Sequence, residues 1–322
     1  MDIEILLILQ ELRFMLGSAG EWIAINLSDA LAALAIVIPF VLFWCFNKRK
    51  GQLMLAVFAG SLMINQLLKL ACAVYRPWIR DSRVKPGKQS LRTATGYSFP
   101  SSHTQLAATA YGDLAFEGKG TKVSQSIFFL SLMFLAGFLR LYLGVHTPQD
   151  VIVGMATAFI MIPVCEKVFT ALAVDRKRDL WAAVLYTGFV IASIVYALNK
   201  SYPMDMADGH LLVDPLEMVQ DFMLSCGLSY GIVMGSILEH RFVSFETDCT
   251  KKEKVLRAIT GFMMFGVLYL ATKFTAVIFT DLYNALFRGW LIGFAAVFVH
   301  PLLFKKFEER KALKERKRKS EL

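Results

Sequence analysis

Lys69-Leu-Ala-Cys-Ala-Val-Tyr-Arg76-Pro77 stands where a strongly apolar segment meets a polar loop. Two later stretches stand at similar borders, Phe99-Pro100-Ser101-Ser102-His103-Thr104 and Arg140-Leu-Tyr-Leu-Gly-Val-His146-Thr-Pro-Gln-Asp150. Together they supply cations, histidines, a carboxylate and serines, which are the groups suited to holding a phosphate and attacking it. The apolar segments around them predict a membrane scaffold.

The composition supports that scaffold, because 56% of the 322 residues are hydrophobic and 19% are charged. The formal net charge is +9, but nine Lys or Arg lie in residues 305–322, where they can face anionic headgroups. We therefore expect membrane lipids and not nucleic acid as partners; the oligomeric state is open. The five cysteines form no C-x-x-C motif and no zinc spacing.

Hydropathy predicts an all-α, polytopic membrane bundle of about nine transmembrane helices. A preceding segment, residues 3–16, is too short and too charged to span, so we expect a helix lying in the membrane interface. The predicted spans cover residues 23–46, 52–75, 103–116, 126–143, 150–172, 180–198, 217–238, 255–279 and 286–304.

Loop charge predicts the orientation of the bundle. When the spans alternate, the basic loops fall on one side, which is then expected to be the cytosol; they are residues 47–50, 117–122, 175–178 and 239–254 and the tail from 305. The N-terminus is then outside and the C-terminus inside. Residues 76–99 break the rule, since this outer loop is also basic. Binding of an anionic substrate is one explanation, and a merely solvated loop is the other.

The first two stretches each have a functional and a structural interpretation. Lys69 and Arg76 are seven residues apart, so on one helix ended by Pro77 they would project from the same face. Alternatively, they are a snorkelling lysine and an interfacial anchor. Ser102 and Gln105 form a capping box, which predicts a helix start with free N–H groups able to bind an anion. A capped helix with a chance histidine is the alternative there.

The third stretch predicts another capped helix, with Thr147 as N-cap, Pro148 at the first position and Asp150 at the third. Asp150 could serve only as part of that cap. It could also accept a proton from one ring nitrogen of His146 and leave the other as a nucleophile. All three stretches fall on the predicted outer side, which favours the catalytic interpretation. No metal is expected, because Asp150 is the one obvious carboxylate among them.

The three stretches resemble the signature of the type 2 phosphatidic acid phosphatase superfamily, which includes lipid phosphate phosphatases, glucose-6-phosphatases and vanadium haloperoxidases. Its pattern is K-x6-R-P, then P-S-G-H, then S-R-x5-H-x3-D. The matching positions are Lys69, Arg76 and Pro77, then Pro100, Ser101 and His103, then Arg140, His146 and Asp150. Ser102 replaces the glycine of the pattern, and Leu139 replaces the serine before the arginine.

The resemblance implies a role for each residue. His146 would attack phosphorus to form a phosphohistidine, Asp150 would orient His146, and His103 would protonate the leaving oxygen. The phosphate oxygens would be held by Lys69, Arg76, Arg140 and the groups at Ser101 and Ser102. No metal or other cofactor is expected, since fixed cations take the place of a metal.

We therefore expect a multi-pass membrane phosphatase acting on a lipid phosphate or diphosphate, such as a phosphatidate-like lipid, undecaprenyl diphosphate or a sphingoid-base phosphate. The expected parts are an N-terminal interfacial helix (1–22), a six-helix phosphatase core (23–200), three additional spans (201–304) and a basic cytosolic tail (305–322). A bacterial plasma membrane with the site facing outside is the expected location. The alternatives are a phosphatase of a soluble ester, a transporter that uses polar residues within the spans, and a non-catalytic lipid-phosphate-binding protein.

Overall fold

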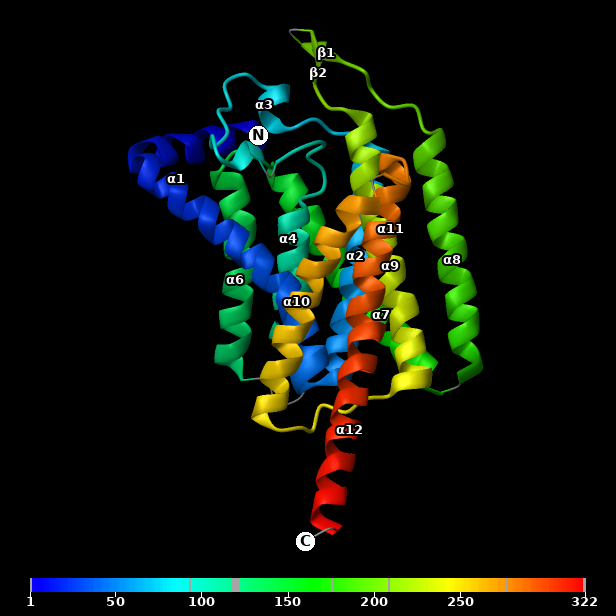
Figure 1. The fold of residues 1–322 in the computed structure, drawn as a ribbon. Coiled ribbons are helices and arrows are strands. Elements are labelled where there is room, and N and C mark those ends of the chain that lie inside the picture. Colours follow the sequence, from blue (N-terminus) through cyan, green and yellow to red (C-terminus); the bar gives the residue numbers. More distant parts are fainter. Residues whose placement is uncertain are drawn as a thin grey trace.

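The computed structural model describes residues 2–92, 94–116, 122–174, 176–207, 209–275 and 277–320. They form a helical bundle with one small hairpin (Figure 1), which confirms the predicted all-α membrane architecture. Within the described residues, eight helices are long and apolar enough to cross a membrane. The predicted third span is a shorter helical stack from Ser102 to Ala115, so eight long helices and one short segment make up the bundle. Residues 117–121 and 175, which belong to predicted cytosolic loops, lie outside the described residues.

Among the described residues, nine helices make up the eight long segments, because α11 and α12 run on as one, and they follow the predicted spans. They are α1 (Asp2–Val41), α2 (Lys48–Cys72), α6 (Val123–Tyr142), α7 (Pro148–Val174), α8 (Arg176–Asn199), α9 (Pro215–Leu238), α10 (Lys251–Thr275), α11 (Asp281–Phe294) and α12 (His300–Ser320). The short elements are α3 (Pro77–Arg80), α4 (Ser102–Ala107), α5 (Asp113–Ala115) and the antiparallel strands β1 (Met206–Ala207) and β2 (His210–Leu211). Four π-helical turns lie at the ends of these helices. The turn Leu42–Phe46 extends α1, and Glu239–Val243 extends α9. The turn Ala108–Gly112 joins α4 to α5, and Ala295–Val299 joins α11 to α12.

The N-terminal arm and the first span form one helix, α1, kinked at Gly17, whose φ of 62° is accessible chiefly to glycine. Before the kink, the arm lies across the end of the bundle that carries α3 (Figure 1). It bears exposed apolar side chains such as Ile8 and Met15, as expected for a helix at a membrane interface.

This arm accounts for part of the charge of the basic outer loop. Arg80 pairs with Asp2 at 3.3 Å, and Arg83 pairs with Glu4 at 3.1 Å as well as with Asp81. These two arginines are therefore engaged in holding the loop to α1. Among the cations of this loop in the described residues, only Arg76 lines the cavity described below. Of the basic residues of the loop, Arg76 is therefore the one placed to contact a substrate there.

Glycines fix the position of α9 against α11. A Cβ added at Gly227 would lie 2.0 Å from the carbonyl oxygen of Leu286, and one added at Gly231 would lie 2.3 Å from that of Trp290. Such separations are far below a van der Waals contact, so only glycine allows the backbones to approach this closely. α9 also packs along α2, which places it beside the first of the three motif stretches.

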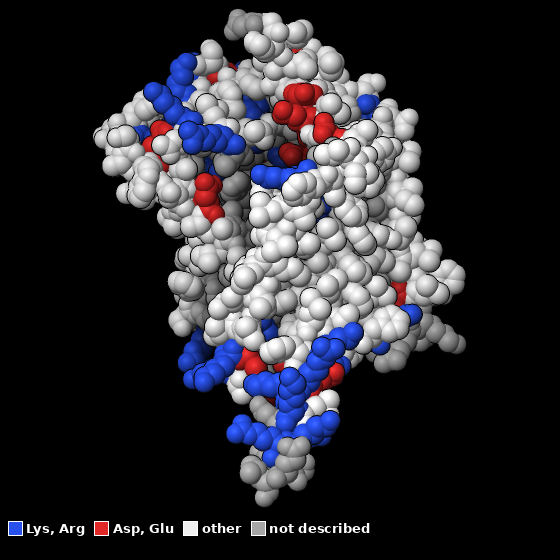
Figure 2. Space-filling model, in the orientation of Figure 1, with Lys and Arg blue, Asp and Glu red and all other residues white. Residues whose placement is uncertain are grey.

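Both ends of the bundle carry charged side chains. The chain termini lie at opposite ends, and α12 projects beyond the bundle at the end away from α3 and the hairpin (Figure 1). Figure 2 shows Lys and Arg gathered around the end from which α12 projects, and at the other end a second group of Lys and Arg at the upper left and Asp and Glu beside a hollow.

Candidate active site

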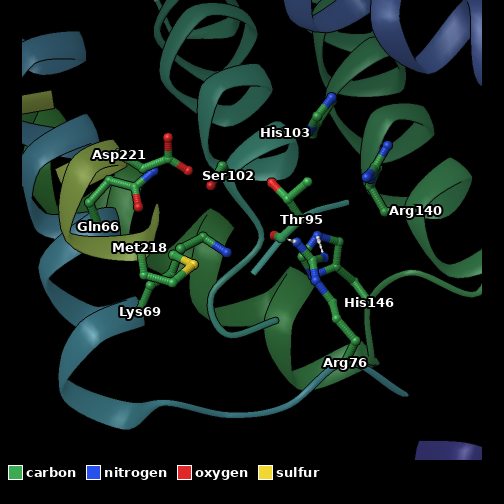
Figure 3. Close-up of a pocket in the computed structure, with 10 residues that line it drawn as sticks. All are labelled: Gln66, Lys69, Arg76, Thr95, Ser102, His103, Arg140, His146, Met218 and Asp221. Atoms are coloured by element: carbon green, nitrogen blue, oxygen red, sulfur yellow. Dashed lines mark hydrogen bonds between the residues drawn. The ribbon is translucent and has the colours of Figure 1, made fainter. Parts of the chain in front are cut away.

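The three motif stretches meet at the end of the bundle that carries α3, where they surround a cavity of about 110 Å³. Six predicted site residues line it (Figure 3), namely Lys69, Arg76, Ser102, His103, Arg140 and His146. The other lining residues are Gln66, Thr95, Met218 and Asp221. Asp150 lies behind His146, and Ser101 turns away to cap α4.

Lys69 and Arg76 share the cavity, but the predicted continuous helix between them is wrong. α2 ends at Cys72, and the next residue, Ala73, adopts a left-handed conformation with φ 48° while its N–H bonds the Lys69 carbonyl. Arg76 precedes a proline, which excludes helical geometry, and it is extended with ψ 153°. A loop, rather than helical periodicity, therefore returns Arg76 to the cavity.

Arg76 is buried, and its guanidinium is almost fully engaged. Nε donates to the Gly96 carbonyl at 3.0 Å, Nη2 to the Thr95 carbonyl at 2.8 Å, and Nη1 to the Val145 carbonyl at 3.0 Å. Nη1 also lies 2.9 Å from Nε2 of His146. These bonds fix the plane of the guanidinium, so Arg76 is a rigid positive group beside the histidine.

Arg140 is positioned differently, because half of its hydrogen-bonding capacity is unused. Its side chain is 1% exposed, and Nη1 donates to Ser28 Oγ at 3.2 Å. Nε and Nη2 have no hydrogen-bond partner in the part of the chain that the structure describes. A buried guanidinium with two free donors at a cavity wall is suited to two oxygens of one anion. Lys69 Nζ, which donates to the Tyr97 carbonyl at 2.6 Å, adds a third buried cation.

His146 lies between Arg76 and Asp150. Its Nδ1 is 3.3 Å from Asp150 Oδ2, and the same oxygen accepts the Thr147 N–H at 2.8 Å and the Ser98 hydroxyl at 2.5 Å. Asp150 therefore makes both contacts that the sequence left as alternatives: one to the helix N-cap and one to the histidine. Since Arg76 can only donate, Nε2 accepts, and the proton of the ring is assigned to Nδ1.

The loop position of His146 also sets its charge. Burial, followed by the positive charges of Arg76, Arg140 and Lys69, lowers the pKa of His146 well below its ordinary value of 6.5. The imidazole is therefore neutral at neutral pH, with a lone pair on Nε2. This is the form that a nucleophilic or metal-ligating histidine requires.

The start of α4 corrects a second expectation. Ser101, not Ser102, is the N-cap, and its hydroxyl accepts from the Thr104 N–H. The N–H of Ser101 donates to the Asp150 carbonyl, so that amide is not free for a ligand. Ser102, which replaces the glycine of the family pattern, donates its hydroxyl to Asn65 Oδ1 at 2.7 Å. His103 follows on the cavity side, with Nε2 3.6 Å from Asp29 Oδ1.

Some functional neighbours were not predicted. Ser98 lies two residues before the second motif, so a search for hydroxyl groups near that motif could have found it. Asp221 lies on α9, far from all three motifs in sequence, and no local signal brings it to the site. Leu139, which replaces the serine of the family pattern, is buried in the apolar core. Its side chain packs against apolar neighbours there, which a serine hydroxyl would not do. In the described part of the chain, no group of three His, Cys, Asp or Glu side chains is arranged to hold a metal ion.

Comparison with known proteins relates the chain to one family. Residues 50–173 match the family described as PAP2 superfamily, and residues 223–312 match the one described as PAP2 superfamily phosphatase, transmembrane extension. The chain is 31% identical over 142 residues to phosphatidylglycerophosphatase B of Bacillus subtilis (strain 168). The aligned region covers 42% of this chain and 65% of that relative, which is less than two thirds of the relative's length. No solved structure matches.

Proposed function

Because the chain belongs to the PAP2 superfamily, we propose that it is an integral membrane phosphatase that hydrolyses a lipid phosphate through a phosphohistidine. One observation carries the proposal: a neutral His146, with Nδ1 toward Asp150, presents Nε2 to a cavity walled by three buried cations. A nucleophile, the group that orients it and the groups that bind the anion are therefore together.

In the first step, His146 Nε2 attacks phosphorus, and the bond from phosphorus to the ester oxygen breaks. The electron pair goes to that oxygen, which takes a proton from His103 and leaves as the alcohol. Asp150 stabilises the positive charge that forms on the imidazole ring. In the second step, water gives a proton to His103 and attacks phosphorus, which breaks the bond to Nε2 and releases inorganic phosphate.

The cations act on the charge of the transferring phosphoryl group. Arg140 offers its free Nε and Nη2, and Lys69 and Arg76 add positive charge from two other directions. Phosphoryl transfer depends mainly on positioning and on electrostatic stabilisation of the equatorial oxygens. Three fixed cations can supply what a metal ion supplies elsewhere, so we expect the reaction to need no metal.

A lipid substrate is favoured by the position of the cavity at the end of a membrane-spanning bundle, beside the interfacial arm of α1. Phosphatidylglycerophosphate, named by the Bacillus relative, joins phosphatidate, sphingoid-base phosphate and undecaprenyl diphosphate as candidates. The concentration of Lys and Arg around α12 favours a cytosolic C-terminus and a site on the outer side of a bacterial plasma membrane (Figure 2).

The test is release of phosphate from each candidate lipid, and from glucose 6-phosphate, by detergent-purified protein. We expect lipid hydrolysis, and a radiolabelled phosphohistidine after rapid quenching with labelled substrate. His146→Ala should abolish both signals, whereas His103→Ala should slow turnover. An active His146→Ala protein would disprove the intermediate. Hydrolysis of glucose 6-phosphate alone would replace the lipid substrate by a soluble one.

A further inference from the structure

One wall of the active-site cavity comes from α9 and carries the carboxylate of Asp221. Figure 3 shows Gln66, Met218 and Asp221 on one side of the cavity and Arg140 and His146 on the other. The phosphatase motifs contain no acid on this wall. Lys69 lies on the same side as Asp221 in Figure 3, so this wall carries one acid and one cation, whereas the opposite wall carries cations and histidine.

Packing of the Met218 side chain against Gly96 fixes the position of Asp221. Met218 is buried against Gly96, where an added Cβ would lie 1.8 Å from the Met218 sulfur. The carbonyl of Gly96 in turn accepts from Arg76 Nε. Asp221 is three residues after Met218, so it lies on the same face of α9. The contact that orders the arginine therefore also places the carboxylate beside the phosphate site.

Both sides of the cavity have unused hydrogen-bonding capacity. Among the described residues, Nε and Nη2 of Arg140 have no hydrogen-bond partner, and neither does the buried Oε1 of Gln66. In the described part of the chain, the carboxylate of Asp221 makes no hydrogen bond or ion pair, and the residue is solvent-accessible. A ligand complementary to this arrangement presents an anion to Arg140 and a hydrogen-bond donor to Gln66 and Asp221.

A second cavity extends this wall. It has a volume of about 370 Å³ and adjoins the first through Arg76, Thr95, Met218 and Asp221, which line both. Glu217, one turn before Asp221 on the same face of α9, and Asp214, the N-cap of that helix, line it as well. A second phosphate attached to the first would lie near up to three carboxylates, and like charges at short range are unfavourable.

We propose that Asp221, assisted by Gln66, selects the substrate: it favours phosphate monoesters that carry a hydroxyl or ammonium group near the phosphate and disfavours diphosphates. This inference rests on the proposed phosphatase function and narrows its substrate class. The donor could be a glycerol hydroxyl or the amine of a sphingoid base, since both offer the same hydrogen bond to a carboxylate.

The experiment compares kcat/KM of the wild type, Asp221→Ala and Asp221→Asn on four micellar substrates. Dodecyl phosphate has no neighbouring donor, lysophosphatidate has a hydroxyl, a sphingoid-base phosphate has an ammonium group, and undecaprenyl diphosphate has a second phosphate. Asp281→Asn is the matched control. It also removes one carboxylate, but Asp281 lies in the first turn of α11 and lines neither cavity.

Asp221→Ala should lower kcat/KM for the hydroxyl and ammonium substrates by about ten- to a hundredfold, the usual worth of a hydrogen bond to a charged group. Dodecyl phosphate should change little, and the diphosphate should improve. Asp221→Asn keeps an acceptor, so it should retain the hydroxyl substrate better than the ammonium one. If the alanine variant does not fold, the change in substrate ranking is measured with Asp221→Asn instead.

The outcomes separate the two proposals. An equal loss on all four substrates, or an unchanged ranking, would overturn the role of Asp221 while leaving the phosphatase intact. The same change of ranking in Asp281→Asn would also overturn it, because general surface charge would then be the cause. If the wild type hydrolyses none of the four and none of the other candidate lipids, the proposed function fails and the inference fails with it. Hydrolysis of phosphatidate alone would overturn the inference and leave the phosphatase intact.

Discussion

Replacement of Asp150 by asparagine removes the charge of this side chain and keeps its shape. Oδ2 of Asp150 accepts from the Thr147 N–H at 2.8 Å and from Ser98 Oγ at 2.5 Å, and it lies 3.3 Å from Nδ1 of His146. An amide oxygen at the position of Oδ2 can make all three contacts, so the start of α7 should remain capped and Nδ1 should keep its acceptor. The amide nitrogen would then take the position of Oδ1, and the negative charge beside the ring would be lost.

The lost charge acts on His146 during the reaction. As Nε2 attacks phosphorus, the ring becomes positive, and a carboxylate stabilises that charge better than a neutral amide does. A hydrogen bond to a charged group contributes about 1.5–3 kcal/mol, so we expect kcat to fall about ten- to a hundredfold.

The assay is kcat for phosphate release together with the thermal midpoint of the same detergent-purified sample. Asp150→Asn should lose activity with little change in midpoint. Ser98→Ala is the comparison: it removes a bond to the same oxygen and the 3.4 Å contact between Ser98 Oγ and His146 Nδ1, but it leaves the carboxylate charge in place, so it should lose less activity. An Asp150→Asn protein that kept half or more of its activity would refute the role of this charge. A large drop in midpoint would show that Asp150 acts mainly as a cap.

Four further predictions follow from the same structure. Because the pKa of His146 is lowered, the nucleophile stays neutral as the pH falls through 6.5, and kcat/KM, corrected for ionisation of the substrate, should fall only at lower pH. Arg76→Gln removes a nearby positive charge, so a pH profile should show this acid limb moved to higher pH. Excess EDTA should leave phosphate release unchanged, and full loss of activity would disprove the metal-free mechanism. Gly227→Val should force α9 and α11 apart and destabilise the protein by about 1–3 kcal/mol in thermal unfolding, whereas Gly266→Val, where an added Cβ meets nothing within 4 Å, should not. A cysteine introduced at Lys88 should react with an impermeant reagent from outside intact cells, and labelling only after permeabilisation would reverse the orientation.

Local sequence determined most of the scaffold, because a bilayer imposes a length and an apolar composition on each crossing helix. It also predicted the capped start of α7, since Thr147, Pro148 and Asp150 act within one turn. The same reasoning placed the cap of α4 one residue too late at Ser102, because two adjacent serines offer similar capping groups. Glycines at intervals of four in α9 and α11 are a further local signal, one of close packing between helices.

The active site likewise depends partly on local sequence and partly on the fold. The order of residues along the chain is enough to identify the reactive groups, since the spacing of Lys69, Arg76, His103, Arg140 and His146 is a one-dimensional property. How these groups meet depends on the fold: a loop after Ala73, not a continuous helix, returns Arg76 to the cavity. The same holds for Asp221, because α9 reaches the site through packing between helices that are distant in sequence. Long-range packing depends on the complementarity of whole surfaces, so no local pattern along the chain records it.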